Sequence, residues 1–148
     1  MAPVANSSVM FATLKAIPWV YPTLEIIHIL GIGLLLGNLF LLELRVLGKG
    51  AALPIKDLAR LSLSIAVVGF CMAAASGLLM FATQAAELLT NRVFTLKMLI
   101  LCLVACNAAW FHGRGSLDKL DGIAKLQMLL SSLLWVAVVS CGRWIAYR

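Results

Sequence analysis

Charged residues are scarce in this chain and are absent from four long stretches of it. Only 12% of the 148 residues are charged and 63% are hydrophobic, whereas soluble domains are about 25% charged and about 45–50% apolar. No Asp, Glu, Lys or Arg occurs in the ranges 26–42, 61–86, 98–111 and 126–142. A helix needs about 20 apolar residues to cross the hydrocarbon core of a bilayer. This scarcity of charge excludes the soluble globular classes and predicts an all-α integral membrane protein with four membrane-spanning helices.

Motifs of familiar soluble enzymes and of exported precursors are missing as well. The chain has no HExxH sequence, no phosphate-binding glycine loop and no readable serine, histidine and carboxylate order. Its first residues lack the basic start, long apolar core and cleavage site of a signal peptide. We therefore expect residues 1–20 to stay attached as an N-terminal segment at the membrane interface. Residues 21–148 are predicted to form a single transmembrane domain.

The turn residues between the apolar stretches indicate where the helices begin and end. The predicted helices run from about 22 to 46, from the loop at 53–55 to about 83, from about 90 to 112, and from about 121 to the C-terminus. Their connections are short, so neighbours in sequence should run antiparallel. The predicted architecture is an up-and-down four-helix bundle.

The net charge of +6 reports membrane topology rather than a nucleic-acid partner, because the basic residues lie in the loops of an apolar chain. The first loop region holds Arg45, Lys49, Lys56 and Arg60, the third holds Arg114, Lys119 and Lys125, and the second holds Arg92. Loops rich in Lys and Arg face the cytoplasm. We expect a multi-pass protein of the bacterial inner membrane with both termini in the periplasm.

Small residues within the predicted helices suggest how the helices pack. Gly33 and Gly37 form a small-xxx-small pair, and the small residues at 73–77 would permit close approach of a neighbouring helix. The cysteines are interpreted first as small packing residues, with a thiolate metal pair as the alternative for two of them. They are Cys71, Cys102, Cys106 and Cys141.

Ionisable groups within the predicted helices gather in the outer half of the membrane, where such groups usually mark a site. Counted at about 1.5 Å per residue from the outer helix ends, His28, Lys97 and Met98 lie ~9–10 Å deep. Glu25 and Arg143 lie at ~6 Å on the same count. Glu25 and His28 are three residues apart, so they are neighbours on one helix face.

His28 admits two interpretations from the residues alone. It is either a histidine hydrogen-bonded within the bundle, with Glu25 as its partner, or an axial ligand of a haem iron. In the second case Lys97, Met98 or water would lie on the opposite side, and Arg143 would suit a haem propionate. Lys97 could instead extend its ammonium group to the outer interface.

The other intramembrane histidine does not fit the same iron. His112 lies ~30 Å from the outer end of its helix, some 20 Å below His28, whereas two axial ligands of one iron lie about 4 Å apart. We expect His112 to cap its helix. Glu43 and Arg45 are expected to form an interfacial pair together with Arg60.

Four motifs in the chain resemble those of an uncharacterised bacterial family of small four-helix membrane proteins. They are YP-x-x-E-x-x-H from Tyr21, F-x-x-K from Phe94, N-x-x-x-F-H from Asn107 and GRWIAY from Gly142. The likeness covers almost the whole chain after residue 20. More remotely, the architecture resembles the copper-resistance D domain and the small membrane-type protoporphyrinogen oxidase. In that oxidase an early histidine and a later lysine matter for haem or porphyrin binding, and by resemblance these fall on His28 and Lys97.

With this resemblance the favoured prediction is a b-type haem in the outer half of the bundle. His28 would be the axial ligand to the metal, oriented by Glu25, with Lys97 or Met98 opposite and Arg143 beside a propionate. The expected function is electron transfer, for example between a quinone and a periplasmic partner, or haem or porphyrin redox chemistry.

Two alternatives come from other functional classes. One is a cofactor-free accessory or structural subunit that packs through Gly33 and Gly37 against a larger membrane complex or a second copy of the chain. It predicts that Glu25 pairs with Lys97 or Arg143. The other is a copper or small-cation handling protein that uses His28, Met72, Met80 and the cysteines.

Overall fold

The computed structural model describes residues 2–147, and in this range it contains helices and no strand. The elements are α1 (Ala2–Ala16), α2 (Val20–Val46), α3 (Ile55–Thr83), α4 (Ala85–Thr90), α5 (Arg92–Arg114), α6 (Ser116–Lys119) and α7 (Gly122–Ile145). The predicted all-α class is confirmed. Helices α2, α3, α5 and α7 are each long and apolar enough to cross a membrane.

The third long helix, α5, begins close to the predicted residue 90, and the short helix α4 that precedes it was not predicted. The chain breaks at Asn91, between the short helix α4 and the long helix α5. The Asn91 side chain accepts hydrogen bonds from the backbone N–H groups of Val93 at 2.9 Å and Phe94 at 3.4 Å. These bonds satisfy backbone donors that a helix leaves unpaired at its first turn, so Asn91 starts a new helix there.

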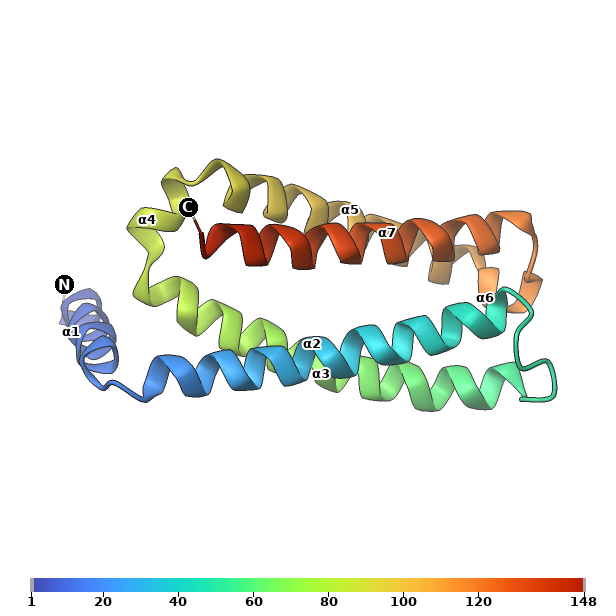
Figure 1. Cartoon of the computed structure of the whole chain (residues 1–148), viewed down its shortest axis with the longest axis horizontal. Coiled ribbons are helices and arrows are strands. Elements are labelled where there is room, and N and C mark those ends of the chain that lie inside the picture. The colour runs from blue at the N-terminus through green and yellow to red at the C-terminus, as the bar shows by residue number, and fades with distance from the viewer. Residues whose placement is uncertain (1, 148) are drawn as a thin grey trace.

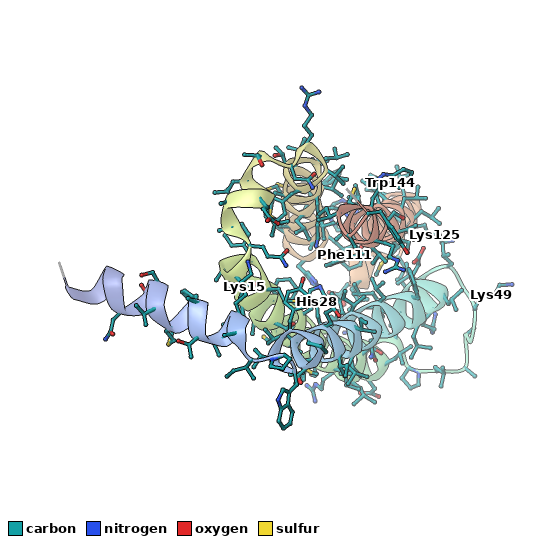
Figure 2. All side chains as sticks on the ribbon, turned by 60° about the vertical axis from the view of Figure 1, so that its left-hand side comes forward. Lys15, His28, Lys49, Phe111, Lys125 and Trp144 are labelled. Carbon is teal, nitrogen blue, oxygen red and sulfur yellow. The ribbon has the colours of Figure 1, made fainter. Side chains whose placement is uncertain are left out.

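The four long helices form two hairpins, α2 with α3 and α5 with α7, which meet along α2 and α7. Figure 1 shows that consecutive long helices run in opposite directions. The hairpins converge at the end that holds α6, here called the α6 end, and diverge toward the end that holds both termini, here called the terminal end. Helix α1 projects away from the bundle at the terminal end (Figure 2).

Backbone contact between two glycines sets the spacing of α2 and α3. A Cβ atom on Gly31 would lie 2.7 Å from the Gly69 carbonyl oxygen, and one on Gly69 would lie 2.6 Å from that of Gly31. Any side chain here would therefore push the helices apart. The run at 73–77 also permits close approach, as predicted, because Ala73 and Ser76 are buried.

Gly33 and Gly37 do not take part in packing between the helices of the described chain. A Cβ atom on either glycine would have no neighbouring atom within 4 Å. Gly31 precedes Gly33 by two residues, which is about 200° around a helix. Gly31, and not Gly33, therefore lies on the face of α2 that packs against α3.

The hydrophobic core lies at the α6 end and includes residues of all four long helices. Its buried members are Leu42 and Val46 of α2, Ala59 of α3, Phe111 of α5, and Ala124 and Met128 of α7. This core holds the two hairpins together at the α6 end, where Figure 1 shows them converging.

Polar contacts at the α6 end join α5 to α7. Arg114 pairs with Asp121 at 2.5 Å, and Asp121 also caps α7 by accepting from the Ala124 N–H at 2.9 Å. Ser116 is fully buried and donates to the Gln127 side-chain oxygen at 2.6 Å. The Arg114 hydrogen bond and the capping N–H hold the pKa of Asp121 at about 2, below its ordinary 3.8.

Candidate functional site

The imidazole of His28 is held against α3 by two hydrogen-bond partners. Its Nδ1 lies 2.8 Å from the Ala73 carbonyl oxygen and 3.1 Å from the Ser76 Oγ. A carbonyl oxygen only accepts, so Nδ1 carries the proton and donates it. In the neutral ring the other nitrogen, Nε2, then has a free lone pair. Histidines that bind metals are commonly oriented in this way.

The surroundings of His28 on α3 consist of small residues. The Ser76 hydroxyl donates to the Met72 carbonyl at 2.6 Å, which leaves its lone pairs to accept from the imidazole. A Cβ atom on Gly77 would lie 3.2 Å from His28 Cε1. Because glycine has no Cβ atom, the imidazole ring has room at this position. The half-buried His28 lies in the interior of the bundle (Figure 2).

Sequence reasoning missed Ala73, Ser76 and Gly77 as partners of His28. One signal was present, because Ser76 lies ~10 Å below the outer end of its helix, at the same depth as His28. Which residue of the small run faces the imidazole depends on the rotation of both helices, and the apolar sequence does not determine that rotation.

Lys97 approaches the same layer from the other hairpin. It is half-buried on α5, and its Nζ would lie 3.5 Å from a Cβ atom on Gly142 of α7. Lys97 is also close enough to interact electrostatically with His28 and with the Cys141 thiol. The structure therefore brings His28 and Lys97 into one region from the two different hairpins.

The three other predicted site residues lie on the protein surface. Glu25 is exposed and makes no hydrogen bond to His28, whose Nδ1 is already engaged by α3. Met98 has 38% of its surface exposed. Arg143 is exposed, donates to the Tyr147 hydroxyl at 2.6 Å and stacks over that ring at 4.8 Å.

The expected ion pair of Glu25 with Lys97 or Arg143 is absent from the described residues. Across residues 2–147 the salt bridges are Lys56 with Asp118 and Arg114 with Asp121, both at the α6 end. Lys97 thus has no carboxylate partner among the described residues. The accessory-subunit alternative predicted such a pair with Glu25, so it loses this support.

The cysteines do not assemble a metal site. All four are free, three of them are exposed and Cys141 is half-buried. In the described part of the chain, no group of three or more His, Cys, Asp and Glu side chains could hold a metal ion. Cys71, Cys102 and Cys106 are exposed, so they do not pack inside the described chain, and no cluster of His, Cys, Asp and Glu side chains supports the copper alternative there.

His112 does not cap α5 with its side chain. The helix continues to Arg114 and ends at Gly115, whose φ of 68° is the left-handed conformation that glycine adopts readily at helix ends. The imidazole is exposed and lies edge-on to the Phe111 ring, with centroids 5.5 Å apart.

Glu43 and Arg45 do not form the predicted interfacial pair. The Arg45 side chain donates to the Leu53 carbonyl at 2.9 Å and so holds the loop after α2. The Glu43 side chain is instead buried and accepts a hydrogen bond from the Ser132 hydroxyl of α7.

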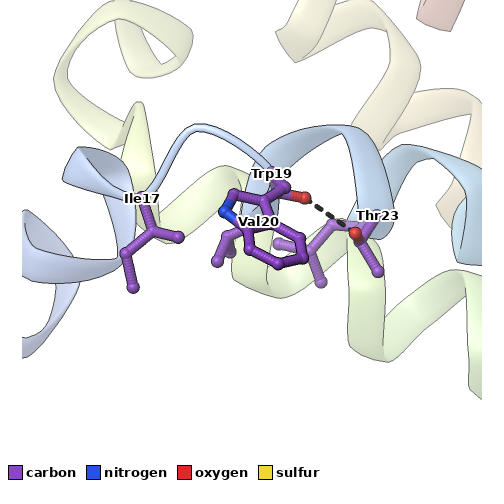
Figure 3. Close-up of a pocket in the computed structure, with 5 residues that line it drawn as sticks. Ile17, Trp19, Val20 and Thr23 are labelled. Carbon is purple, nitrogen blue, oxygen red and sulfur yellow. Dashed lines mark hydrogen bonds between the residues drawn. The ribbon is translucent and has the colours of Figure 1, made fainter.

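A pocket of about 200 Å³ lies at the junction of α1 and α2, as Figure 3 shows. It is lined by Ile17, Trp19, Val20, Thr23 and Leu24. The Thr23 hydroxyl donates to the Trp19 carbonyl at 2.7 Å. Ligand pockets are usually about 300–1,000 Å³ and hold free polar groups, so this surface pocket is not the candidate site.

No protein-family model, curated protein sequence or solved structure matches this chain. The family resemblances of its motifs therefore stay predictions, and the candidate site is defined by His28, Lys97 and their surroundings.

Proposed function

We propose that this chain is a multi-pass membrane protein that binds a b-type haem between its two hairpins, with His28 as an axial ligand. The membrane assignment follows from the four long apolar helices. Basic residues gather at the α6 end: Lys49 in the loop after α2, Lys56 at the start of α3 and Lys119 in α6. By the positive-inside rule the α6 end faces the cytoplasm, and both termini face the periplasm of a bacterial inner membrane.

The observation that carries the proposal is the orientation of the His28 ring. Its Nδ1 proton is held by the Ala73 carbonyl at 2.8 Å, so the lone pair of Nε2 is free. A histidine that served only to link two helices would be satisfied by this one bond. The free Nε2 of a fixed, half-buried imidazole is the nitrogen that can bind iron.

The residues around His28 also fit a haem. Lys97 is half-buried without a carboxylate partner, and an unpaired lysine in apolar surroundings can act as a neutral ligand. Its position favours it over the outward-facing Met98 as the residue opposite His28. A b-type haem needs no cysteine attachment, and it supplies reversible one-electron chemistry when bound.

Each residue of the site would have a distinct role. Ala73 and Ser76 orient the imidazole, and Gly77 leaves room for the ring. Arg143, exposed at the terminal end, suits a propionate at the membrane surface. A redox centre near the periplasmic side would transfer electrons between a membrane quinone and a periplasmic partner, or take part in haem or porphyrin redox chemistry.

The experiment is an absorption spectrum of the detergent-purified protein, oxidised and dithionite-reduced, from cells supplied with a haem precursor. We expect a Soret band and reduced α and β bands in the wild type. His28→Ala should remove them, whereas His112→Ala should keep them because His112 lies at the α6 end. Size-exclusion chromatography and circular dichroism check that both variants fold. A colourless wild-type protein would refute the proposal.

A cofactor-free packing subunit is the second candidate, and one observation favours it. Gly33 and Gly37 present an open backbone surface on α2, where a Cβ atom would meet no other helix of the described residues within 4 Å. A partner helix or a second copy could approach closely there. In that case Gly37→Leu would abolish co-purification of the partner while the isolated chain keeps its fold, and the wild type would be colourless.

A further inference from the structure

Glu43 is a buried carboxyl group that the proposed haem site does not use. It lies one turn before the end of α2, and only 8% of its surface is exposed. Its chain neighbour Leu42 and, one turn on, Val46 belong to the hydrophobic core. The polar contact of its side chain is with the Ser132 hydroxyl of α7. A carboxyl group is thus enclosed where the two hairpins meet.

No cation neutralises this carboxyl group within the described residues. On α2 itself, Arg45 is bound to the Leu53 carbonyl. On α3 the nearest charged residues, Asp57 and Arg60, are exposed, and on α7 Lys125 is exposed. No ion pair among the described residues includes Glu43.

A metal ion is a poor candidate for the missing positive charge. Hard cations such as Ca²⁺ or Mg²⁺ require about six oxygen ligands. Among residues 2–147, Glu43 belongs to no group of three or more metal-ligating side chains. A proton needs only the carboxylate oxygen, and an enclosed carboxyl group without a counter-charge becomes neutral by binding one.

We propose that Glu43 is a proton-binding site within the membrane domain, neutral in the folded bundle and hydrogen-bonded to Ser132. Release breaks the O–H bond of the acid, passes the proton to water at the α6 end and leaves a carboxylate. The site is near that end because α2 stops at Val46, three residues on. It does not depend on the haem, since Glu43 is 15 residues, or ~22 Å, from His28 along α2.

Proton release would act on the contact between the hairpins. The hydrogen bonds of His28 lie within the α2–α3 hairpin, and that of Asn107 lies within the α5–α7 hairpin. The bond between Glu43 and Ser132 instead joins α2 to α7. An uncompensated carboxylate would draw water into this interface, so loss of the proton should loosen the hairpins.

Infrared spectroscopy of the purified full-length protein tests the proposal directly. We expect the wild-type minus Glu43→Gln difference spectrum at neutral pH to show the C=O stretch of a neutral carboxylic acid, with a shift in D₂O. Glu25→Gln is the matched control on the same helix, and the neutral-acid C=O stretch of Glu43 should persist in it. Carboxylate bands in the Glu43 difference spectrum would overturn the proposal.

A second variant decides the outcome if Glu43→Gln does not fold. Ser132→Ala keeps the acid but removes its hydrogen-bond partner. The neutral-acid C=O stretch of the wild type should then persist at a higher frequency, as expected for a carbonyl group that has lost a hydrogen bond. Absence of a neutral-acid band from both proteins would refute the assignment. A band with the same frequency in both would refute the role of Ser132.

Discussion

The contact between Gly31 and Gly69 predicts a large effect from one added methyl group. In Gly69→Ala the new Cβ would lie 2.6 Å from the Gly31 carbonyl oxygen and 2.7 Å from the Leu35 nitrogen. Both are backbone atoms and cannot rotate away. To reach ordinary contact at 3.4 Å, α2 and α3 must separate by about 0.8 Å. Overpacking of this kind destabilises by about 1–3 kcal/mol, and we expect the upper part of that range.

The same displacement should disturb the candidate site. Ala73 lies one turn after Gly69 on α3, so moving α3 by about 0.8 Å would stretch its bond to His28 Nδ1 from 2.8 Å to about 3.6 Å, beyond hydrogen-bonding distance. The imidazole would then lose its fixed orientation. We expect Gly69→Ala to lower haem content together with stability.

The assay is unfolding by SDS in mixed micelles, followed by circular dichroism, with haem content measured on the same samples. The matched control is Gly33→Ala, because a Cβ at that position meets nothing within 4 Å. Gly33→Ala should leave the free energy of unfolding unchanged or raise it by up to about 1 kcal/mol, since Ala favours the helix more than Gly. If Gly69→Ala is as stable as Gly33→Ala, the inferred contact between α2 and α3 is wrong.

Three further predictions concern the site and the α6 end. Because the pKa of Asp121 is about 2 in the fold and 3.8 is its ordinary value, its stabilisation is present above pH ~4 and is lost as pH falls through about 2. The unfolding midpoint should therefore fall over the same pH range. Asp121→Asn should abolish this pH dependence. Lys97→Ala should convert a six-coordinate low-spin haem spectrum to a high-spin one, whereas Met98→Ala should not. Ser116→Ala should lower the free energy of unfolding by about 1–3 kcal/mol in the SDS assay, because the buried polar partners of Ser116 lose their hydrogen bond. An unchanged unfolding midpoint would contradict this prediction.

The number and bounds of the long helices could be predicted because charge is so unevenly distributed. Stretches without Asp, Glu, Lys or Arg coincide with the four helices, and the turn residues lie between them. The start of the third long helix near Asn91 was predicted, but the short helix α4 before it was not. Asn is a strong helix-capping residue, so a signal for the break between α4 and α5 was present in the sequence.

The rotation of the helices could not be predicted in the same way. Helix α2 is apolar around most of its circumference and carries glycines at 31, 33 and 37 on different faces. A helix in lipid has no polar side that must face water, so the hydrophobic pattern does not select which glycine packs. This is why Gly33 and Gly37 were chosen and Gly31 was overlooked.

Depth along a helix was more informative than rotation at the candidate site. Counting residues placed His28 and Lys97 in one layer, and in the structure both are half-buried, one on each hairpin. Glu25 was expected beside His28, but three residues correspond to about 300° around a helix, which leaves the two side chains about 60° apart. That angle places Glu25 on the surface, while His28 faces α3.

The most direct test of the account is the hyperfine coupling of iron to histidine nitrogen in the oxidised protein labelled with ¹⁵N-histidine. If His28 Nε2 binds the haem iron, pulsed electron paramagnetic resonance should detect strong coupling to one imidazole nitrogen. The coupling should persist in His112→Ala and vanish in His28→Ala. A haem signal without histidine coupling, or with coupling that survives in His28→Ala, would contradict the assignment of His28 as the ligand.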